Sequence, residues 1–263
     1  MINFMVIGTI CLSFLMFYVV NQIINYFGPP QMLIKANSNE KHKMSKSKRF
    51  WKYKNVLGSL FHSILSGTFA LLCFYQNEDI RSDLINTYTT GCLILVSFSL
   101  GYFIHDAFDM IKNSSEQQSY ELVIHHSIIF VCFGISVFSR LFIGYALVAL
   151  LVEVNSIFLH MRQLLGFLGF NKSDCKYRIN NILNIGSFLV FRMLTLAWMT
   201  RWLVMNRSNV SFGYYTIGSV GMAIITLMNI ILFYRIIYSD FIKSVSRQRR
   251  IQIITVQDSN FNS

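Results

Sequence analysis

The sequence predicts an all-α integral membrane protein with seven transmembrane helices. Hydrophobic residues make up 54% of its 263 positions and charged residues only 13%, well below the roughly 25% charged content of soluble domains. Several apolar runs reach or approach the roughly 20 residues that a helix needs to cross a bilayer. In none of these runs do apolar and polar residues alternate as they would in a β-strand. The hydrocarbon core contains no water to hydrogen bond with the backbone, so helices are expected.

The first expected span is interpreted as a retained anchor, because it has neither a basic segment before it nor a small-residue cleavage site. Gly28, Pro29 and Pro30 follow it and are expected to end its helix. The seven expected spans cover residues 2–27, 55–76, 84–110, 121–139, 141–167, 178–205 and 212–238.

One membrane domain without internal repeats is expected. Residues 1–48 hold the first span and a basic linker, 49–240 hold the other six spans, and 241–263 form a polar tail. The segment 35–54 contains eight Lys and Arg, whereas nothing basic precedes the first span. The positive-inside rule therefore places the linker and the tail in the cytoplasm and the N-terminus outside.

The net charge of +11 does not indicate a nucleic acid partner. The basic segment 35–54 is explained as a topology determinant that touches anionic lipid. The five cysteines suggest neither a disulfide nor a zinc site, because they lie in separate spans or in a cytoplasmic loop. They are Cys11, Cys73, Cys92, Cys132 and Cys175.

Polar residues inside the spans are the candidate site residues, since each ionisable one costs about 2.5–3.5 kcal/mol on insertion scales. Helical spacing places several of them on common faces. In the second span these are Asn55, Ser59, His62 and Ser66. In the third span they are Tyr102, His105 and Asp109, with Asp106 beside them. These four residues of the third span are equally well explained as interfacial residues near a helix end.

The fifth span carries Glu153 near its middle, on one face with Ser156 and His160, while Asn155 and Arg162 lie on the neighbouring face. A carboxylate among leucines and valines is expected to face the interior of the bundle, against Arg192 of the sixth span.

The fourth span holds two adjacent histidines, His125 and His126, whose side chains point about 100° apart on a helix. This geometry and the absence of HxxxH spacing argue against a metal site, and no cofactor is expected. An imidazole in this position can act as a base, a nucleophile or a structural hydrogen-bonding group.

Together these residues resemble the TLC domain, named for TRAM, Lag and the neuronal ceroid lipofuscinosis proteins. The resemblance covers about residues 49–240. In the fifth span it is greatest to the calfacilitin-like branch of animal plasma membrane proteins, which influence membrane fluidity and phospholipid acyl composition. The matching elements, in family order, are Trp51, Asn55, Ser59, His62 and Ser63, the segment 101–111 (GYFIHDAFDMI), the pair His125 and His126, and the segment 151–165 (LVEVNSIFLHMRQLL).

The resemblance implies a six-helix TLC barrel, preceded by one extra span, with a lipid-accessible cavity inside it. Ceramide synthases of this family use paired histidines and aspartates for acyl transfer. Their His-Asp element follows the histidine pair, whereas here His105 and Asp106 precede it, which disfavours acylation of sphingoid bases. The cavity-lining residues would be His62, Tyr102, His105, Asp109, Asn155, His160 and Arg192.

The preferred hypothesis is regulation of phospholipid acyl composition and membrane fluidity by lipid binding in this cavity. The alternative is a lipid acyltransferase in which His125 or His126 accepts an acyl group or deprotonates an amine, with Glu153 or Asp106 orienting the imidazole. Seven spans also prompt a third reading, a receptor or channel regulator.

Membrane phospholipids are the expected partners, joined by acyl-CoA in the acyltransferase alternative. The oligomeric state is open. The last four residues are not an endoplasmic reticulum retrieval signal, so the plasma membrane is the expected compartment and the endoplasmic reticulum is the alternative.

The predicted orientation is testable at the glycosylation sequons. Asn113 and Asn171 would lie in the cytoplasm, and Asn206 and Asn209 would lie outside, very near the membrane. Asn113 and Asn171 should therefore stay unmodified in a glycosylating cell. Peptide mass spectrometry after N-glycosidase treatment checks each sequon, and a glycan at Asn113 would overturn the orientation.

Overall fold

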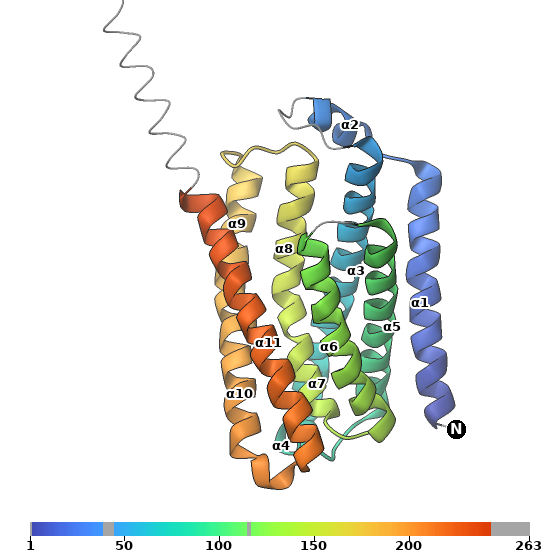
Figure 1. Ribbon diagram of the computed structural model, residues 1–263, viewed down its shortest axis with the longest axis vertical. Helices are drawn as coiled ribbons and strands as arrows, with labels where there is room; N and C mark the ends of the chain where they lie inside the picture. Colours follow the sequence, from blue (N-terminus) through green and yellow to red (C-terminus); the bar gives the residue numbers. More distant parts are fainter. Residues whose placement is uncertain (1, 39–44, 115–116, 243–263) are drawn as a thin grey trace, which may run out of the picture. The chain divides into compact units, whose positions relative to one another are not determined.

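The computed structural model of the chain describes residues 2–38, 45–114 and 117–242, and these form helices and turns with no strand among them (Figure 1). Seven helices in this part are long and apolar enough to cross a membrane, which confirms the predicted fold class. The spans are α1 (Ile2–Phe27), α3 (Lys46–Gln76), α5 (Thr90–Asn113), α6 (Gln117–Ser139), α7 (Ile143–Leu150) with α8 (Val152–Phe167), α9 (Cys175–Phe188) with η1 (Leu189–Leu194) and α10 (Thr195–Met205), and α11 (Phe212–Ile237).

Two helix boundaries differ most from the prediction. Helix α3 begins at Lys46 rather than near residue 55. The basic residues before residue 55 lie outside the apolar run that was used to predict the span, but lysine and arginine are good helix formers, so the helix extends through them. Helix α5 begins at Thr90 rather than near residue 84. The short helix α4 (Glu78–Ser82) and a turn precede it.

The turn before α5 is held by the Asp83 carboxylate. Its Oδ1 atom accepts the backbone N–H of Ile85 at 2.9 Å and that of Asn86 at 3.0 Å. These bonds lower the pKa of Asp83. As predicted, α1 ends at Phe27, and Gly28 follows it in the left-handed region with a φ of 72°.

The described helices divide into two compact units after Met222. The first unit holds α1 to α10, the short helices α2 (Gln31–Ser38) and η2 (Arg207–Asn209), and the start of α11. The second holds the rest of α11 and η3 (Tyr238–Ile242). A six-helix barrel that includes the last span stays a prediction, as do the domain boundaries at residues 48 and 240. The predicted tail beyond Ile242 and linker residues 39–44 lie outside the described residues.

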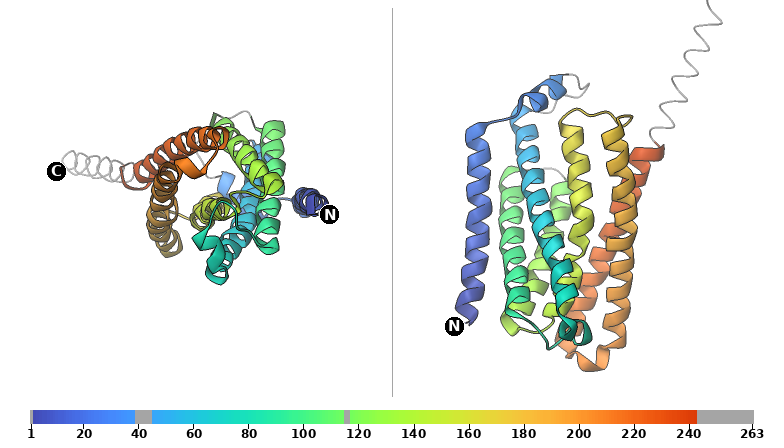
Figure 2. Two further views of the ribbon diagram at one scale, coloured as in Figure 1. Left: turned by 90° about the horizontal axis from the view of Figure 1, so that it is seen from below. Right: turned by 180° about the vertical axis from the view of Figure 1, so that it is seen from behind.

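Helix α5 is at the centre of the first unit. It contacts α1, α3 and α6, while α3 also packs along α8, and α8 along α9 (Figures 1 and 2). In the 18-residue apolar window of α5, 67% of the residues are buried, whereas 17% are buried in the corresponding window of α1. Helix α5 is therefore enclosed by other helices, whereas most of α1 faces outward.

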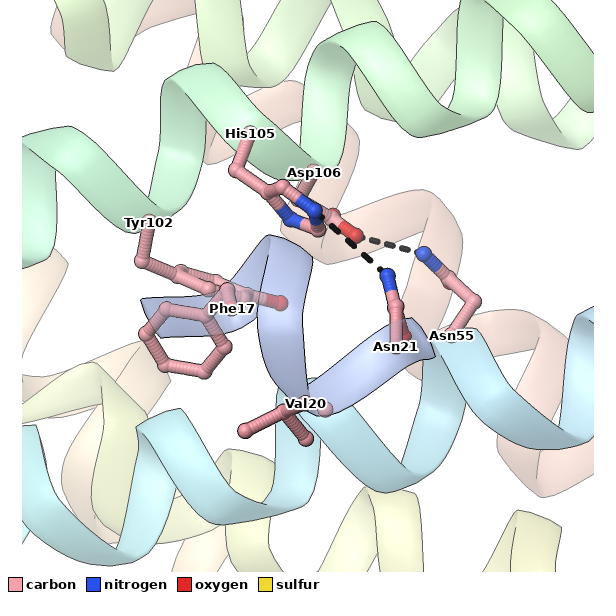
Figure 3. A pocket seen from close by; sticks show the side chains of 8 residues that line it. Phe17, Val20, Asn21, Asn55, Tyr102, His105 and Asp106 are labelled. Atoms are coloured by element: carbon pink, nitrogen blue, oxygen red, sulfur yellow. Dashed lines mark hydrogen bonds between the residues drawn. The ribbon is translucent and has the colours of Figure 1, made fainter. Parts of the chain in front are cut away.

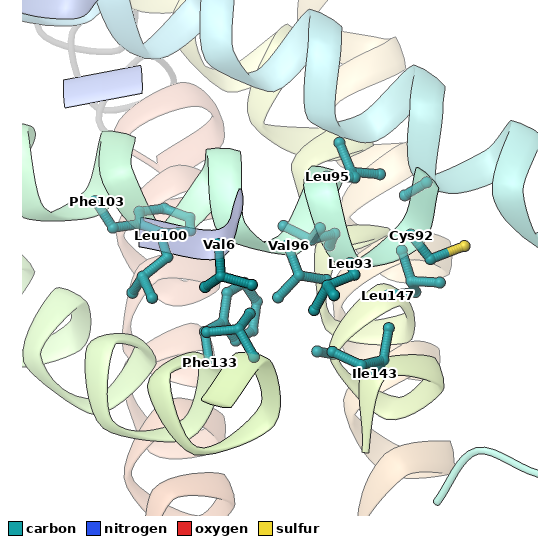
Figure 4. Close-up of a cluster of buried hydrophobic side chains, with 14 of the residues drawn as sticks. Val6, Cys92, Leu93, Leu95, Val96, Leu100, Phe103, Phe133, Ile143 and Leu147 are labelled. Atoms are coloured by element: carbon teal, nitrogen blue, oxygen red, sulfur yellow. The ribbon is translucent and has the colours of Figure 1, made fainter. Parts of the chain in front are cut away.

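Apolar side chains fill the contact between α5 and its neighbours (Figure 4). Leu93, Val96, Leu100 and Phe103 follow one another at helical spacing on α5. Lipid is as apolar as these side chains, so close van der Waals packing rather than exclusion of water stabilises the contact. Their neighbours in the same cluster include Val6, Phe133, Ile143 and Leu147.

Gly101 allows α1 to lie directly on α5. A Cβ atom at this position would be 2.8 Å from the Ser13 Cβ atom and nearer still to the backbone oxygen of Ile10. One turn before Gly101, the Phe98 carbonyl accepts a hydrogen bond from the Ser13 hydroxyl at 2.7 Å. Small residues thus bring the two backbones together, as is common between membrane helices.

Replacement of Gly101 by alanine should push α1 away from α5. We expect a loss of about 1–3 kcal/mol, the usual cost of overpacking, seen as a lower melting temperature in detergent. The control is Gly134→Ala on α6, where an added Cβ atom would meet nothing within 4 Å. Equal melting temperatures for the two variants would contradict the packing role of Gly101.

Candidate functional site

Asp106 on α5 lies between two other helices and is only 3% exposed. Its Oδ1 atom accepts a hydrogen bond from the side-chain amide of Asn55 on α3. Its Oδ2 atom lies 3.5 Å from Nδ1 of His126 on α6. Glu153 and Asp106 were both predicted as possible partners of a histidine. The structure places Asp106 beside His126. This carboxylate can orient the imidazole and stabilise its protonated form.

His62 on α3 is 1% exposed and lies against aromatic rings. Its ring stacks on Tyr102 with centroids 3.9 Å apart and 13° between the planes, and meets the edge of Phe103 at 5.0 Å. The Tyr102 hydroxyl donates to Ser59 Oγ at 2.8 Å. Within the described residues, neither ring nitrogen of His62 has a hydrogen-bond partner. A buried polar group without a partner is unusual in a native protein and calls for an explanation.

Glu153 lies where the fifth span is interrupted. The backbone N–H groups of Leu151 and Val154 donate to carbonyls three residues earlier, both at 3.1 Å, and α8 restarts at Val152. Glu153 is therefore in the first turn of α8, where the helix dipole favours a carboxylate. The Ser63 hydroxyl of α3 donates to its Oε2 atom at 2.6 Å.

Arg192 lies in the π-helical segment η1 of the sixth span and is 8% exposed. Single π turns inside helices are frequent at functional sites. Its Nη2 atom donates to Ser156 Oγ on α8 at 2.8 Å, and its guanidinium lies 5.5 Å from the centre of the Phe188 ring. It also interacts electrostatically with Glu153, the partner that the sequence analysis assigned to it.

Four histidines gather near these charged residues. His62 and His126 both lie against the Phe103 ring, with ring centroids 5.0 and 5.2 Å from it, and His160 on α8 is near both histidines. The His125 ring lies 5.7 Å from that of His126. His125 and His160 are half-buried, whereas His62 and His126 are buried.

His105 lies on the α1 side of the site, next to Tyr102 and Asp106. It turns toward α1, where its Nε2 atom lies 3.4 Å from the side-chain nitrogen of Asn21 and its ring meets the edge of Phe14 at 5.4 Å. The residue borders a small cavity between α1, α3 and α5 (Figure 3). That cavity is lined by Phe17, Val20, Asn21, Asn55, Gly58, Tyr102, His105 and Asp106.

Asp109 and Asn155, two other predicted lining residues, are engaged in helix contacts. Asp109 accepts hydrogen bonds from the Trp51 indole at 2.8 Å and the Asn113 amide at 3.0 Å, near the end of α5. Asn155 is fully buried. Its amide lies 2.9 Å from the Asn184 carbonyl and 3.0 Å from Ser187 Oγ, which ties α8 to α9.

Two residues of α1 belong to the site but were missed in the sequence. Phe17 is 2% exposed, and its ring lies 4.6 Å from that of Tyr102 and 6.2 Å from that of His62. Asn21 contacts His105. A polar residue in an apolar span was a signal for Asn21, but nothing distinguished Phe17 among the 24 phenylalanines. Helix α1 is therefore part of the wall around His62 and Tyr102.

The chemistry available at the site is that of imidazoles, carboxylates and one guanidinium in a low-dielectric interior. Such groups can bind the polar part of a lipid, and His126 with Asp106 can also move a proton. Within residues 2–38, 45–114 and 117–242, no group of three or more His, Cys, Asp or Glu is placed to hold a metal ion.

Comparison with known proteins gives consistent matches over most of the chain. The family model of the TLC domain matches residues 52–238. TLC domain-containing protein 2 of Danio rerio is 48% identical over 202 residues, which cover 77% of this chain and 81% of that protein. The human protein of the same name is 32% identical over 194 residues, covering 74% and 73%. Human TLC domain-containing protein 1 is 33% identical over 193 residues, covering 73% and 77%.

Loss of the Ser63 hydroxyl should destabilise the protein, because it leaves the Glu153 carboxylate without its serine donor. We expect Ser63→Ala to cost about 1.5–3 kcal/mol, the range for hydrogen bonds to charged groups. Ser66→Ala is the matched control, since that buried hydroxyl donates only to the His62 carbonyl of its own helix at 2.8 Å. Thermal unfolding in detergent compares the two, and an equal effect would exclude a special role for the bond between Ser63 and Glu153.

Proposed function

Because the chain belongs to the TLC domain family and crosses the membrane several times, we propose that it regulates the acyl composition of membrane phospholipids and thereby membrane fluidity. It would do so by holding a lipid among the polar side chains inside the first helical unit. The plasma membrane is the proposed compartment, with the N-terminus outside and the C-terminus in the cytoplasm. The endoplasmic reticulum is the alternative.

The observation that carries this proposal is the unpartnered, fully buried imidazole of His62 next to the other inward-facing polar groups. Burial of a polar group without a partner costs free energy. A lipid ester or headgroup oxygen with a hydroxyl neighbour would supply the missing hydrogen bonds. Arg192 adds a positive charge within the same interior, which suits a phosphate oxygen.

The outer surface of the spans supports the same assignment. Most large exposed side chains on α1 and α6 are apolar, among them Phe4, Leu12 and Phe130. Hydrocarbon chains of surrounding lipid can cover such a surface without cost. The ionisable side chains of His62, Asp106 and Arg192 are instead buried, where the polar part of a bound lipid would contact them.

Acyl transfer is a second candidate function, favoured by the contact between His126 and Asp106. Because Nδ1 of His126 faces the carboxylate at 3.5 Å, Nε2 is the nitrogen available to a substrate. It would accept an acyl group from acyl-CoA or remove a proton from the acceptor lipid. This pairing singles out Asp106 rather than Glu153 as the orienting residue.

The test uses cells that lack the protein and are complemented with wild type or variants at equal membrane levels. Phospholipid acyl chains are then measured by mass spectrometry. We expect wild type to shift the acyl composition and His62→Leu to lose most of that shift. Ser127→Ala should keep it, because that exposed hydroxyl on α6 bonds only to its own helix at 2.9 Å. Full activity of His62→Leu would reject the lipid-holding proposal.

Purified protein separates the two candidate functions. Transfer of labelled acyl groups from acyl-CoA to a phospholipid, abolished by His126→Ala and strongly reduced by Asp106→Asn, would establish acyl transfer. Retention of the cellular effect by both variants would exclude it. Lipids that co-purify with wild type but not with His62→Leu, identified by mass spectrometry, would show what the interior holds.

A further inference from the structure

The small cavity between α1, α3 and α5 is surrounded by groups that form hydrogen bonds. Asn21 comes from α1, Asn55 from α3, and His105 and Asp106 from α5. In Figure 3 the two amides, the imidazole and the carboxylate turn toward one another around this space. Three helices therefore contribute donors and acceptors to one place on the α1 side of the site.

Gly58 on α3 also lines the cavity, and helix packing does not explain it. At Gly67 on the same helix, a Cβ atom would be 3.1 Å from the Val154 backbone nitrogen, so that glycine allows a close helix contact. A Cβ atom at Gly58 would meet no described atom within 4 Å. Glycine inside a helix costs stability relative to alanine. The cavity offers an explanation, because a larger side chain at Gly58 would take up its space.

The polar groups around the cavity can form more hydrogen bonds than they make with one another. The Asp106 Oδ1 atom accepts from the Asn55 amide, and a carboxylate oxygen can accept a second bond. The Asn21 amide nitrogen lies 3.4 Å from His105 Nε2, which is longer than a usual hydrogen bond. A molecule that both donates and accepts would complement this mixture of groups.

Water fits the cavity in size and in chemistry. The space is about that of one water molecule, and a buried water needs two to four polar partners. The cavity offers four such side chains. The rings of Phe17 and Tyr102 form the rest of its wall and are almost completely buried. An acyl chain in this place would instead leave the polar groups without partners, which costs free energy.

Water can enter this cavity from the side of α1 and α3. Asn21, Asn55 and Gly58 are partly exposed, and Asn21 lies in the last two turns of α1. Polar groups also continue along α5 to the helix end. Asp109, one turn after His105, accepts a hydrogen bond from the exposed Asn113 side chain at 3.0 Å. The cavity is therefore close to a polar end of the helices.

We propose that this cavity is a water-binding site in which one water molecule joins His105 to Asp106. The water accepts a hydrogen bond from the Asn21 amide and donates to the Asp106 carboxylate and to the His105 ring. Because the other carboxylate oxygen of Asp106 faces His126, the water extends this contact toward α1. His105 is then a positioning residue for the water. The water site does not depend on the proposed function and stands even if the lipid-holding test fails.

Radiolytic labelling of the purified full-length protein tests for the water. A short X-ray pulse generates hydroxyl radicals from bound water, and these oxidise adjacent side chains, which peptide mass spectrometry detects. We expect Phe17 to be oxidised several-fold more than Phe133 on α6. Both are phenylalanines, and Phe133 is the more exposed of the two, at 5% against 2%, but does not line the cavity. Equal oxidation of the two rings would refute the water site.

Variants show whether the labelling comes from this cavity. Gly58→Leu should fill the space and reduce the oxidation of Phe17 to the level of Phe133. Gly134→Leu is the control, because a Cβ atom at that position on α6 also meets no described atom within 4 Å. It should leave the oxidation of Phe17 unchanged. Unchanged labelling in Gly58→Leu would place the water elsewhere and reject the proposal.

A second variant tests the assigned hydrogen bonds and serves if Gly58→Leu does not fold. Asn21→Leu removes a polar partner of the water from the partly exposed side of the cavity. We expect the same loss of Phe17 oxidation in this variant. A thermal melt in detergent confirms that each variant is folded before labelling. Labelling of Phe17 at the wild-type level in folded Asn21→Leu would contradict the bridging role.

Discussion

The position of Asp106 between α3 and α6 is the constraint on which the rest of the site depends. A carboxylate in the membrane interior is expensive unless its oxygens are satisfied. The Asn55 amide and the His126 imidazole lie against its two oxygens. The hydrogen bond from Asn55 and the closeness of His126 together restrict the rotation of α5 relative to α3 and α6. Tyr102, one turn earlier on α5, thereby comes to stack on His62.

Helix α1 completes this arrangement from the outer side of α5. The family match begins at residue 52 and so leaves α1 out, yet Phe17 lies against Tyr102 and His62. Its close approach depends on Gly101, where a larger residue would meet the α1 backbone. The first span thus shields the aromatic side of the site from lipid in addition to anchoring the chain.

Two irregular segments place the opposite charges of the interior. The tight turn at Leu151 puts Glu153 at the start of α8, and the π-helical segment η1 carries Arg192 toward Ser156. In a regular α-helix, neither Glu153 nor Arg192 would point in this direction. A tight turn contains fewer residues than an α-helical turn and a π turn contains more, so each rotates the following side chains around the helix axis. The hydroxyls of Ser63 and Ser156 hold the charged side chains of Glu153 and Arg192 in these positions.

The sequence by itself determined the number of spans, their approximate limits and the residues that had to avoid lipid. Length and hydropathy are sufficient for this, because the bilayer requires continuous apolar helices. Helical spacing also predicted that Glu153, His62 and the histidine pair would face protein. Only the tertiary structure decided the partners: Asp106 rather than Glu153 lies beside His126, Ser63 holds Glu153, and His105 turns to α1. Partner choice depends on helix rotation, tilt and local breaks, and a periodic pattern of polar residues does not encode which neighbouring helix each face will meet.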